Sequence, residues 1–324
     1  PGFVGCFFQL RGTIPRIFVR YRLVRSKALE PLEKAHSTAT ACICLFALFM
    51  GVSAVAPAWG QRKFEQSKEI GIALGTAYYK GDINPNAHLG GRLTVGYGGF
   101  YRHNFSTRLG LRINYFQGRI EAWDADSSDP WQQNRNLHFR NDVGELSALF
   151  EINYLDHQIG NPGHRLTAFL YAGLGVYTHM PEAELDGLWT PLQPLGTEGQ
   201  GTTWGEANGV DAYGTTGISM PFGFGFKSNI GPFTTLNIDW GVRKTWTDYL
   251  DDVSGMYADR AVLLQERGEV TAALADRSLQ PEGGVNNQGG LQRGDPSRTD
   301  MYAYITASLS FRISKKPTTC WSEI

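Results

Sequence analysis

Eight stretches of this chain alternate apolar and polar side chains, and this pattern restricts the fold more than any other feature. In the stretch TLNIDWGVRKTW at 235–246, Leu236, Ile238 and Trp240 share one face, and polar or small residues share the other. A period of two is typical of a β-strand, because successive side chains of a strand point to opposite faces. The same alternation occurs at 69–78, 92–102, 108–115, 145–154, 166–177, 218–227 and 301–312. Each stretch is about long enough to cross a lipid bilayer at a tilt.

The connections between these stretches alternate in length. Those at 103–107, 156–164 and 228–233 are short, whereas those at 80–91, 122–138, 180–214 and 248–300 are long. An even number of antiparallel strands, with short turns at one rim and long loops at the other, is the pattern of outer-membrane barrels. The sequence therefore predicts an all-β fold, an eight-stranded antiparallel transmembrane β-barrel with short periplasmic turns and long extracellular loops.

The two faces of the predicted strands differ in chemistry. The apolar face is expected to contact lipid, and aromatic residues near the strand ends are expected to form a girdle at the membrane interfaces. The girdle residues are Tyr78, Tyr101, Tyr115, Tyr154 and Trp246. The polar face is expected to line the lumen, where glycines leave room for larger neighbours. Its charged residues are Glu69, Arg92, Arg112, Glu145, Glu151, Lys227, Asp239 and Arg243.

The predicted lumen is narrow. A barrel of this size has an interior that is just wide enough for side chains to fill. Charges in such a water-poor space must pair, because burial of an unpaired charge is costly. We therefore predict an internal salt-bridge network and a plugged barrel, not an open porin.

The composition along the chain predicts four parts. These are a spurious or disordered basic extension at 1–33, a secretory signal peptide at 34–60, the barrel at 61–313 and a C-terminal tail at 314–324. The signal peptide is predicted from an almost wholly apolar run at 39–56 that small residues follow. A transmembrane helix is the alternative, since the run is close to long enough.

The long loops contain features of their own. Asp248, Asp251 and Asp252 could supply oxygen ligands to a cation, or could lie in a solvated turn. The segment 259–277 is predicted to form one short amphipathic helix that caps the barrel or docks a partner. The glycine- and asparagine-rich stretch 280–298 is predicted to be mobile, as is the second half of the loop at 180–214.

Charge and motif content argue against two functional classes. The formal net charge is −1 and there is no basic stripe, so we expect no nucleic-acid partner. Neither GxSxG nor HExxH occurs. His179 lies near Glu182, Glu184 and Asp186 in the sequence, which is the one local cluster of catalytic residue types. We expect no enzyme, no cofactor and no metal site beyond the weak aspartate candidates.

Three motifs resemble one known family. GDINP within 69–85, FEINY within 139–154 and TDYLDDVSGMY at 247–257 resemble the PorG-like outer-membrane β-barrels of Bacteroidetes-type bacteria, and the resemblance spans 69–312. It implies a barrel that anchors type IX secretion machinery to the outer membrane. It also implies a periplasmic ring lipoprotein and its partner as binding partners, beside the outer-membrane lipids. It implies no catalytic residue.

Two other functions remain open at the level of sequence. One is a surface-binding or adhesion barrel that acts through its long extracellular loops. The other is passive transport of small solutes, against which the predicted charge pairing in the lumen argues. In each case the expected location is the outer membrane.

Overall fold

The computed structural model describes residues 66–85, 91–280 and 287–313. The predicted basic extension at 1–33, the signal peptide at 34–60 and the tail at 314–324 lie outside the described residues.

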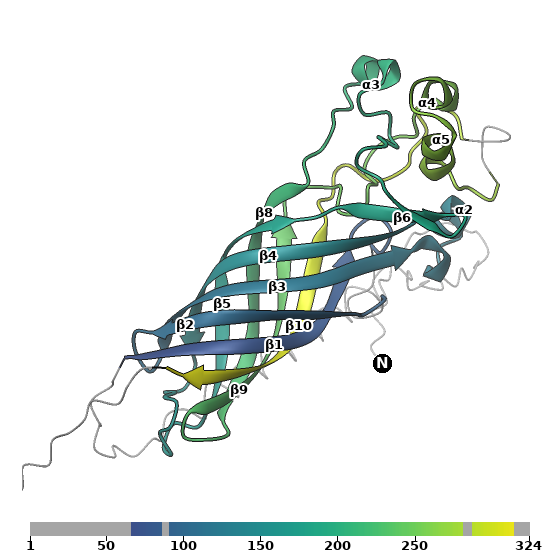
Figure 1. The fold of residues 1–324 in the computed structure, drawn as a ribbon. Coiled ribbons are helices and arrows are strands. Elements are labelled where there is room, and N and C mark those ends of the chain that lie inside the picture. Colours follow the sequence, from purple (N-terminus) through teal and green to yellow (C-terminus); the bar gives the residue numbers. More distant parts are fainter. Residues whose placement is uncertain (1–65, 86–90, 281–286, 314–324) are drawn as a thin grey trace, which may run out of the picture. The chain divides into compact units, whose positions relative to one another are not determined.

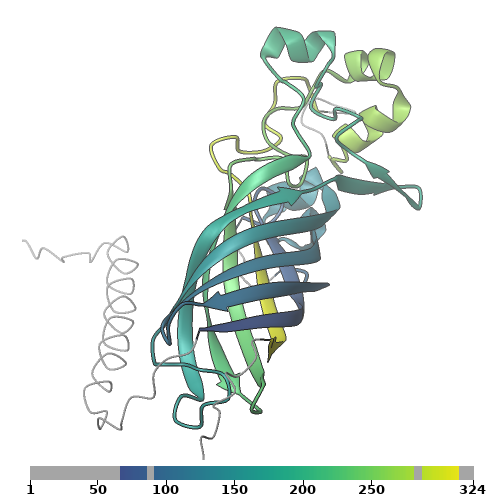
Figure 2. The ribbon, with the colours of Figure 1, turned by 60° about the vertical axis from the view of Figure 1, so that its left-hand side comes forward.

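Eight long antiparallel strands form a closed barrel (Figures 1 and 2). They are β1 (Ser67–Lys80), β2 (Thr94–Asn104), β3 (Leu109–Trp123), β4 (His138–Asn153), β5 (Leu166–Thr178), β8 (Thr216–Asn229), β9 (Thr234–Thr245) and β10 (Met301–Arg312). Their order is β3-β2-β1-β10-β9-β8-β5-β4, and pairing of β3 with β4 closes the circle. Closure leaves no strand edge unpaired, which a membrane-spanning sheet requires. The predicted fold class is confirmed.

The two ends of the barrel differ as predicted. Short turns join β2 to β3, β4 to β5 and β8 to β9, and the other four connections are long. β3 and β4 extend well beyond the predicted 108–115 and 145–154. The period-two pattern does not mark these extra residues, because their outward side chains are charged and not apolar. Cross-strand pairs such as Arg119 with Asp142 continue the strand pairing there.

The long loops fold into a cap above the barrel (Figure 2). The cap contains the hairpin β6 (Pro181–Leu185) and β7 (Leu188–Pro191), the 3-10 helix η2 (Asp124–Asp126), and the helices α2 (Pro130–Arg135), α3 (Thr203–Asn208), α4 (Arg260–Glu266) and α5 (Glu269–Ala275). β6 pairs with the outer end of β4. Among the described residues, no helix combines the length and apolar character needed to span a membrane.

One prediction about the long loops is wrong. The segment 259–277 forms two helices and not one, because Gly268 adopts a φ of 95° that breaks the helix between α4 and α5. The mobility predicted for 280–298 and for the second half of the loop at 180–214 stays a prediction, although single side chains of both segments are buried. Glu198, Gln200 and Arg293 are buried, and their side chains bond to other cap segments or lie among them.

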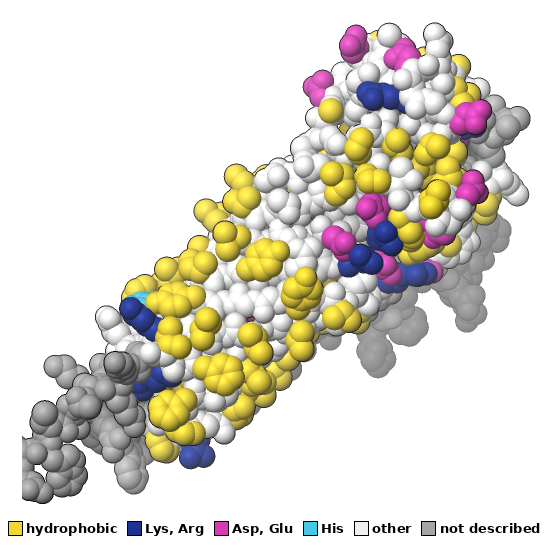
Figure 3. All heavy atoms as spheres, in the orientation of Figure 1, with side chains coloured by type: hydrophobic (Ala, Val, Ile, Leu, Met, Phe, Trp, Pro, Cys, Tyr) yellow, Lys and Arg dark blue, Asp and Glu magenta, His cyan; other side chains and the backbone are white. Residues whose placement is uncertain are grey.

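The outer wall of the barrel is apolar. The outward residues Ile70, Ile72 and Leu74 of β1 are 53%, 65% and 67% exposed, and Leu170 and Leu174 of β5 are similar. Figure 3 shows apolar side chains spread over the face of the barrel wall that it presents. So large an exposed apolar surface is stable in lipid and not in water. The chain is therefore a membrane-spanning β-barrel of the outer-membrane type.

The predicted aromatic girdle is present in part. Tyr101, Tyr115 and Trp246 are exposed on the outer wall, and Tyr154 is partly exposed just beyond the end of β4. Tyr78 is buried instead. It packs with Val242 and Ala303, and its hydroxyl accepts a hydrogen bond from Trp240 Nε1 at 2.9 Å.

Candidate functional site

The lumen near the short-turn end holds a cluster of buried charges, which we call the lumen charge cluster. Its members are Glu69, Arg102, Arg112, Glu151, Lys227 and Asp239. Glu151 is the hub, with oxygens 2.9 Å from Arg102 Nε, 3.0 Å from Arg112 Nε and 2.6 Å from Lys227 Nζ. Alternation along the strands places all six side chains inward, where they are at most 5% exposed.

The charges of the lumen balance. A second pair lies farther toward the long-loop end, with Arg243 Nε 3.6 Å from Glu145 Oε1. Together with the lumen charge cluster this makes four carboxylates and four cations. Equal numbers of opposite charges in direct contact allow burial without a counter-ion.

The structure places seven of the eight predicted lumen residues inside the barrel. The exception is Arg92, for which the predicted position in the lumen is wrong. β2 begins at Thr94, so Arg92 precedes the strand, and its side chain is 44% exposed on the outer surface. There it pairs with Asp126 at 2.8 Å. Arg102 was missing from the predicted set, although its position in the alternation places it inward.

An aromatic layer fills the lumen beyond these charges. It comprises Tyr79, Phe116, Phe139, Tyr177, Tyr302 and Tyr304. The Tyr302 hydroxyl donates to Glu145 at 2.6 Å, and the Arg243 guanidinium lies 4.3 Å from the centre of the Tyr304 ring. Gly96 makes room for this layer, since a Cβ there would lie 2.5 Å from the Phe116 ring.

The extracellular mouth is closed by residues 248–255, which we call the stopper. Leu250 and Val253 are at most 1% exposed and pack against the aromatic layer. Several elements hold the backbone of the stopper. Asn141 of β4 donates to Leu250 O at 2.7 Å, the Leu250 amide donates to Asp300 at 2.9 Å, and the Ser254 amide donates to Glu198 at 2.9 Å.

A buried polar cluster fixes the stopper to the rest of the cap. Arg293 Nη1 lies 2.9 Å from Glu198 Oε1 and donates to the backbone oxygen of Asp252 at 2.5 Å. The side chains of Thr197 and Tyr213 donate to the Asp252 carboxylate. Asp252 has a φ of 65°, a left-handed conformation that aspartate tolerates better than most residues. The pKa of the Asp252 carboxyl is raised to about 6 by burial.

The three aspartates proposed as weak metal candidates do not converge. Asp251 points to Tyr79, Asp252 points to Thr197, Tyr213 and Arg293, and Asp248 shares neither set of partners. Burial raises the pKa of the Asp248 carboxyl to about 8, which disfavours its charged form at neutral pH. Within the described part of the chain, no three side chains of His, Cys, Asp or Glu form a group that could hold a metal ion.

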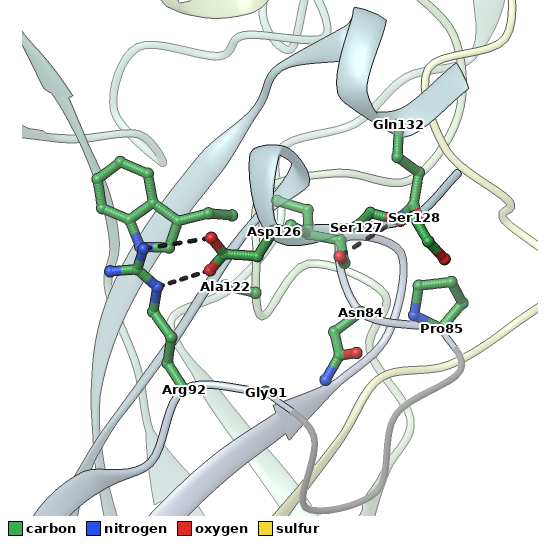
Figure 4. A pocket seen from close by; sticks show the side chains of 11 residues that line it. Asn84, Pro85, Gly91, Arg92, Ala122, Asp126, Ser127, Ser128 and Gln132 are labelled. Carbon is green, nitrogen blue, oxygen red and sulfur yellow. Dashed lines mark hydrogen bonds and ion pairs between the residues drawn. The ribbon is translucent and has the colours of Figure 1, made fainter. Parts of the chain in front are cut away.

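The outer wall also carries exposed ion pairs. Arg119 Nε lies 2.7 Å from Asp142, and Arg140 Nη2 lies 2.8 Å from Glu182. A pocket of about 180 Å³ lies beside Arg92 and Asp126 (Figure 4). Its described lining combines both apolar and polar groups and suggests no particular ligand.

The predicted histidine cluster is not assembled. His179 stacks on Tyr213, and one ring nitrogen lies 3.1 Å from Gly214 O, while Glu182 pairs with Arg140. His138 stacks on Trp123 and accepts a hydrogen bond from the Glu184 amide at 3.0 Å. Burial lowers the pKa of both imidazoles to about 4, so both are neutral at pH 7.

The comparisons with known proteins give no specific role. A family model described as "Domain of unknown function (DUF6089)" matches residues 48–184. No curated protein matches the chain.

Solved outer-membrane proteins are similar at low identity. Neisserial surface protein A (NspA) is 9% identical, with a TM-score of 0.37, over 77% of this chain and 99% of that one. The attachment invasion locus protein Ail of Yersinia pestis is 10% identical, with a TM-score of 0.35, over 77% and 99%. The N-terminal β-barrel domain of Pseudomonas aeruginosa OprF is 8% identical, with a TM-score of 0.32, over 76% and 100%. Because these scores are low, the barrel assignment rests on the strand pairings and on the apolar outer wall.

Proposed function

We propose that this chain is a non-conducting outer-membrane scaffold. The observation that carries this proposal is the filled lumen. The lumen charge cluster, the aromatic layer and the stopper follow one another from the short-turn end to the extracellular mouth. A barrel that is packed in this way has no continuous water path through it. Its function therefore depends on the surfaces at its two ends. The proposed location is the bacterial outer membrane, because the apolar outer wall and the closed sheet suit that bilayer.

We infer that the periplasmic end is a docking face. Each of the three short turns exposes apolar side chains, which are Phe105, Leu155, Ile230 and Phe233 at 45%, 43%, 59% and 53%. Exposed apolar groups of this kind suit contact with another protein. The resemblance of the three sequence motifs to the PorG-like family supports type IX secretion machinery as the partner, with a periplasmic ring lipoprotein and its own partner at these turns.

A deletion strain complemented with turn variants tests this role. In the first variant, Phe105, Leu155, Ile230 and Phe233 are replaced together by serine. In the control, the exposed cap residues Leu264, Val270 and Leu279 are replaced by serine. The measurement is mass spectrometry of the culture medium, together with co-purification in mild detergent. The proposal expects that only the turn variant fails to restore the release of type IX substrates and loses the ring lipoprotein. An unchanged secretome in the deletion strain would refute the secretion role.

The second candidate is a surface-binding barrel, and the packing of the cap favours it. Buried groups such as Glu198 and Arg293 make the cap a pre-organised surface, and α4 and α5 expose Leu264 and Val270 on it. Pre-organisation reduces the entropy cost of binding a partner. The same strains test this candidate when adhesion to cells or matrix is measured. The cap variant should then lose binding and the turn variant should retain it.

A further inference from the structure

One tyrosine hydroxyl lies between two buried carboxylates where the stopper meets the barrel. Tyr79 Oη is 2.5 Å from Asp251 Oδ2 and 2.8 Å from Asp300 Oδ1. Tyr79 is at the outer end of β1, Asp251 is in the stopper, and Asp300 directly precedes β10. All three are at most 1% exposed. Gly81 leaves space for this contact, because a Cβ there would lie 1.8 Å from Asp300 Oδ1.

The hydrogen atoms at this contact can be counted. Asp251 Oδ1 accepts from the Val253 amide at 3.0 Å, and Asp300 Oδ2 accepts from the Leu250 amide at 2.9 Å. The two remaining carboxylate oxygens both face Tyr79 Oη, which has a single hydrogen to donate. If both aspartates were ionised, one buried anionic oxygen would face the lone pairs of the hydroxyl without a hydrogen between them. Such a contact is costly.

The distances indicate where the extra hydrogen resides. A hydroxyl that donates to a charged carboxylate makes a short bond of about 2.5–2.7 Å, whereas a neutral O–H···O bond is about 2.7–2.8 Å. The shorter distance is to Asp251 and the longer one is to Asp300. With one hydrogen shared between the two carboxylates, the shorter bond fits Tyr79 donating to Asp251 and the longer one fits Asp300 donating to Tyr79; burial and Asp82 raise the pKa of the Asp251 carboxyl as well.

We propose that Asp300 holds a proton at neutral pH and that this proton is a latch, which fastens the stopper to β1 and β10 and is released as the pH rises. The proton completes a chain from Asp300 through Tyr79 to Asp251. Its loss leaves two carboxylates to compete for one hydroxyl, while Asp300 and Asp251 both remain bonded to stopper amides. Repulsion then acts directly on the stopper. The latch does not depend on which partner the barrel docks.

The surrounding groups favour the protonated form. Carboxylates approach from two segments: Asp82 lies after β1, and Asp248 and Asp251 lie in the stopper. Tyr177 of β5 faces Asp300 as well. Arg135 of α2 is the cation that acts on Asp251, and it is already bonded in two places to Asp124. Burial and the neighbouring Asp251 raise the pKa of the Asp300 carboxyl well above its usual range.

The direction of the pH dependence follows from this shift. A carboxyl whose pKa is higher in the folded than in the unfolded state stabilises the folded state below the unfolded value, about 3.9 for aspartate. This stability is lost progressively as the pH rises toward the folded value. The stopper should therefore be held tightly in acid and loosened in alkali. The lumen charge cluster below it has separate partners, so a loosened stopper does not by itself open a pore.

Hydrogen exchange of the refolded full-length barrel in detergent tests the latch. Mass spectrometry follows peptides that cover 248–254 between pH 5 and pH 9, corrected for the intrinsic rate. The wild type should lose protection as the pH rises, by at most about tenfold per pH unit for one proton. Asp300→Asn should retain protection at alkaline pH, because its amide can donate permanently to Tyr79 while its oxygen accepts from Leu250. An equal loss of amide protection in the wild type and in Asp300→Asn would overturn the proposal.

A second variant keeps the proposal falsifiable if Asp300→Asn folds poorly, and infrared spectra locate the proton where Asp300→Asn folds. Asp251→Asn removes the competing carboxylate, so it should also protect the stopper at alkaline pH, and loss equal to the wild type would count against the latch. Infrared spectra at neutral pH should show a protonated carboxylic acid band in the wild type that is reduced in Asp300→Asn. Asp248→Asn is the matched control, and it should leave the Asp300 contribution to this band in place. A band that is unchanged in Asp300→Asn would place the proton elsewhere and refute the assignment.

Discussion

Replacement of Glu151 by glutamine perturbs the lumen charge cluster at its hub. The change keeps the size of the side chain but removes the charge that Arg102, Arg112 and Lys227 share at 2.6–3.0 Å. Removal of one partner from a buried ion pair typically costs about 3–5 kcal/mol, because an uncompensated charge stays buried. At about 1.4 kcal/mol for each factor of ten, the folding equilibrium should shift by roughly two to four orders of magnitude.

The assay for Glu151→Gln is denaturant unfolding in lipid vesicles, read from the mobility difference between folded and unfolded barrel on gels. Glu182→Gln is the matched control. It makes the same chemical change in the exposed pair with Arg140, where both side chains are about a quarter to a third exposed, and exposed pairs contribute only about 0–1 kcal/mol.

A second variant separates charge balance from packing. Glu151→Gln leaves one cation in excess in the lumen, because Arg102 and Arg112 keep Glu69 and Asp239. Lys227→Met in this background removes that excess and should recover part of the lost stability. If Glu151→Gln were as stable as Glu182→Gln, or if the added Lys227→Met change only destabilised further, the reasoning about buried charge would be refuted.

Three other predictions address the lumen packing, the cap and its pH dependence. Gly96→Ala should cost about 1–3 kcal/mol in the same unfolding assay, because its Cβ would meet the Phe116 ring at 2.5 Å, whereas Gly99→Ala, with one contact at 3.2 Å, should cost less. Gly268→Ala should destabilise the cap by about 1–3 kcal/mol through backbone strain alone, since φ is 95° and no atom lies within 4 Å of the added Cβ. Limited proteolysis of the cap measures this loss, and Gly255→Ala is the control that should be nearly neutral. Because the pKa values of the Asp252 and Asp248 carboxyls are raised to about 6 and about 8, the cap should become more sensitive to protease as the pH rises from 4 to 8. A cleavage rate that stays constant or falls, after correction for protease activity, would contradict this.

The barrel and most of its lumen could be predicted from the sequence, because strand alternation is a local signal. Glu151 and Lys227 occupy inward positions for the same reason that Ile72 and Leu174 occupy outward ones. Arg92 is predicted wrongly because the alternation in the sequence begins two residues before β2 does, at Thr94. Arg102 could have been found from the same alternation that identified its neighbours.

The cap could not be predicted, because tertiary contacts between distant segments create it. Tyr79 and Asp251 are 172 residues apart, and Glu198 and Arg293 are 95 residues apart. No periodicity marks the stopper, and the glycine-rich composition around Glu198 suggested mobility. Burial of Asp251 and Asp252 depends on partners from β1 and from the loops at 180–214 and 248–300, so the sequence left a metal site and a solvated turn both open.

Planar-bilayer recording of the purified wild-type barrel tests the central claim most directly, because that claim is a lumen filled from end to end. With the lumen charge cluster, the aromatic layer and the stopper in place, insertion of the barrel should produce no steady current above that of the bare bilayer. Stable, stepwise currents that scale with the number of inserted barrels would contradict the filled lumen, and the scaffold proposal would fall with it.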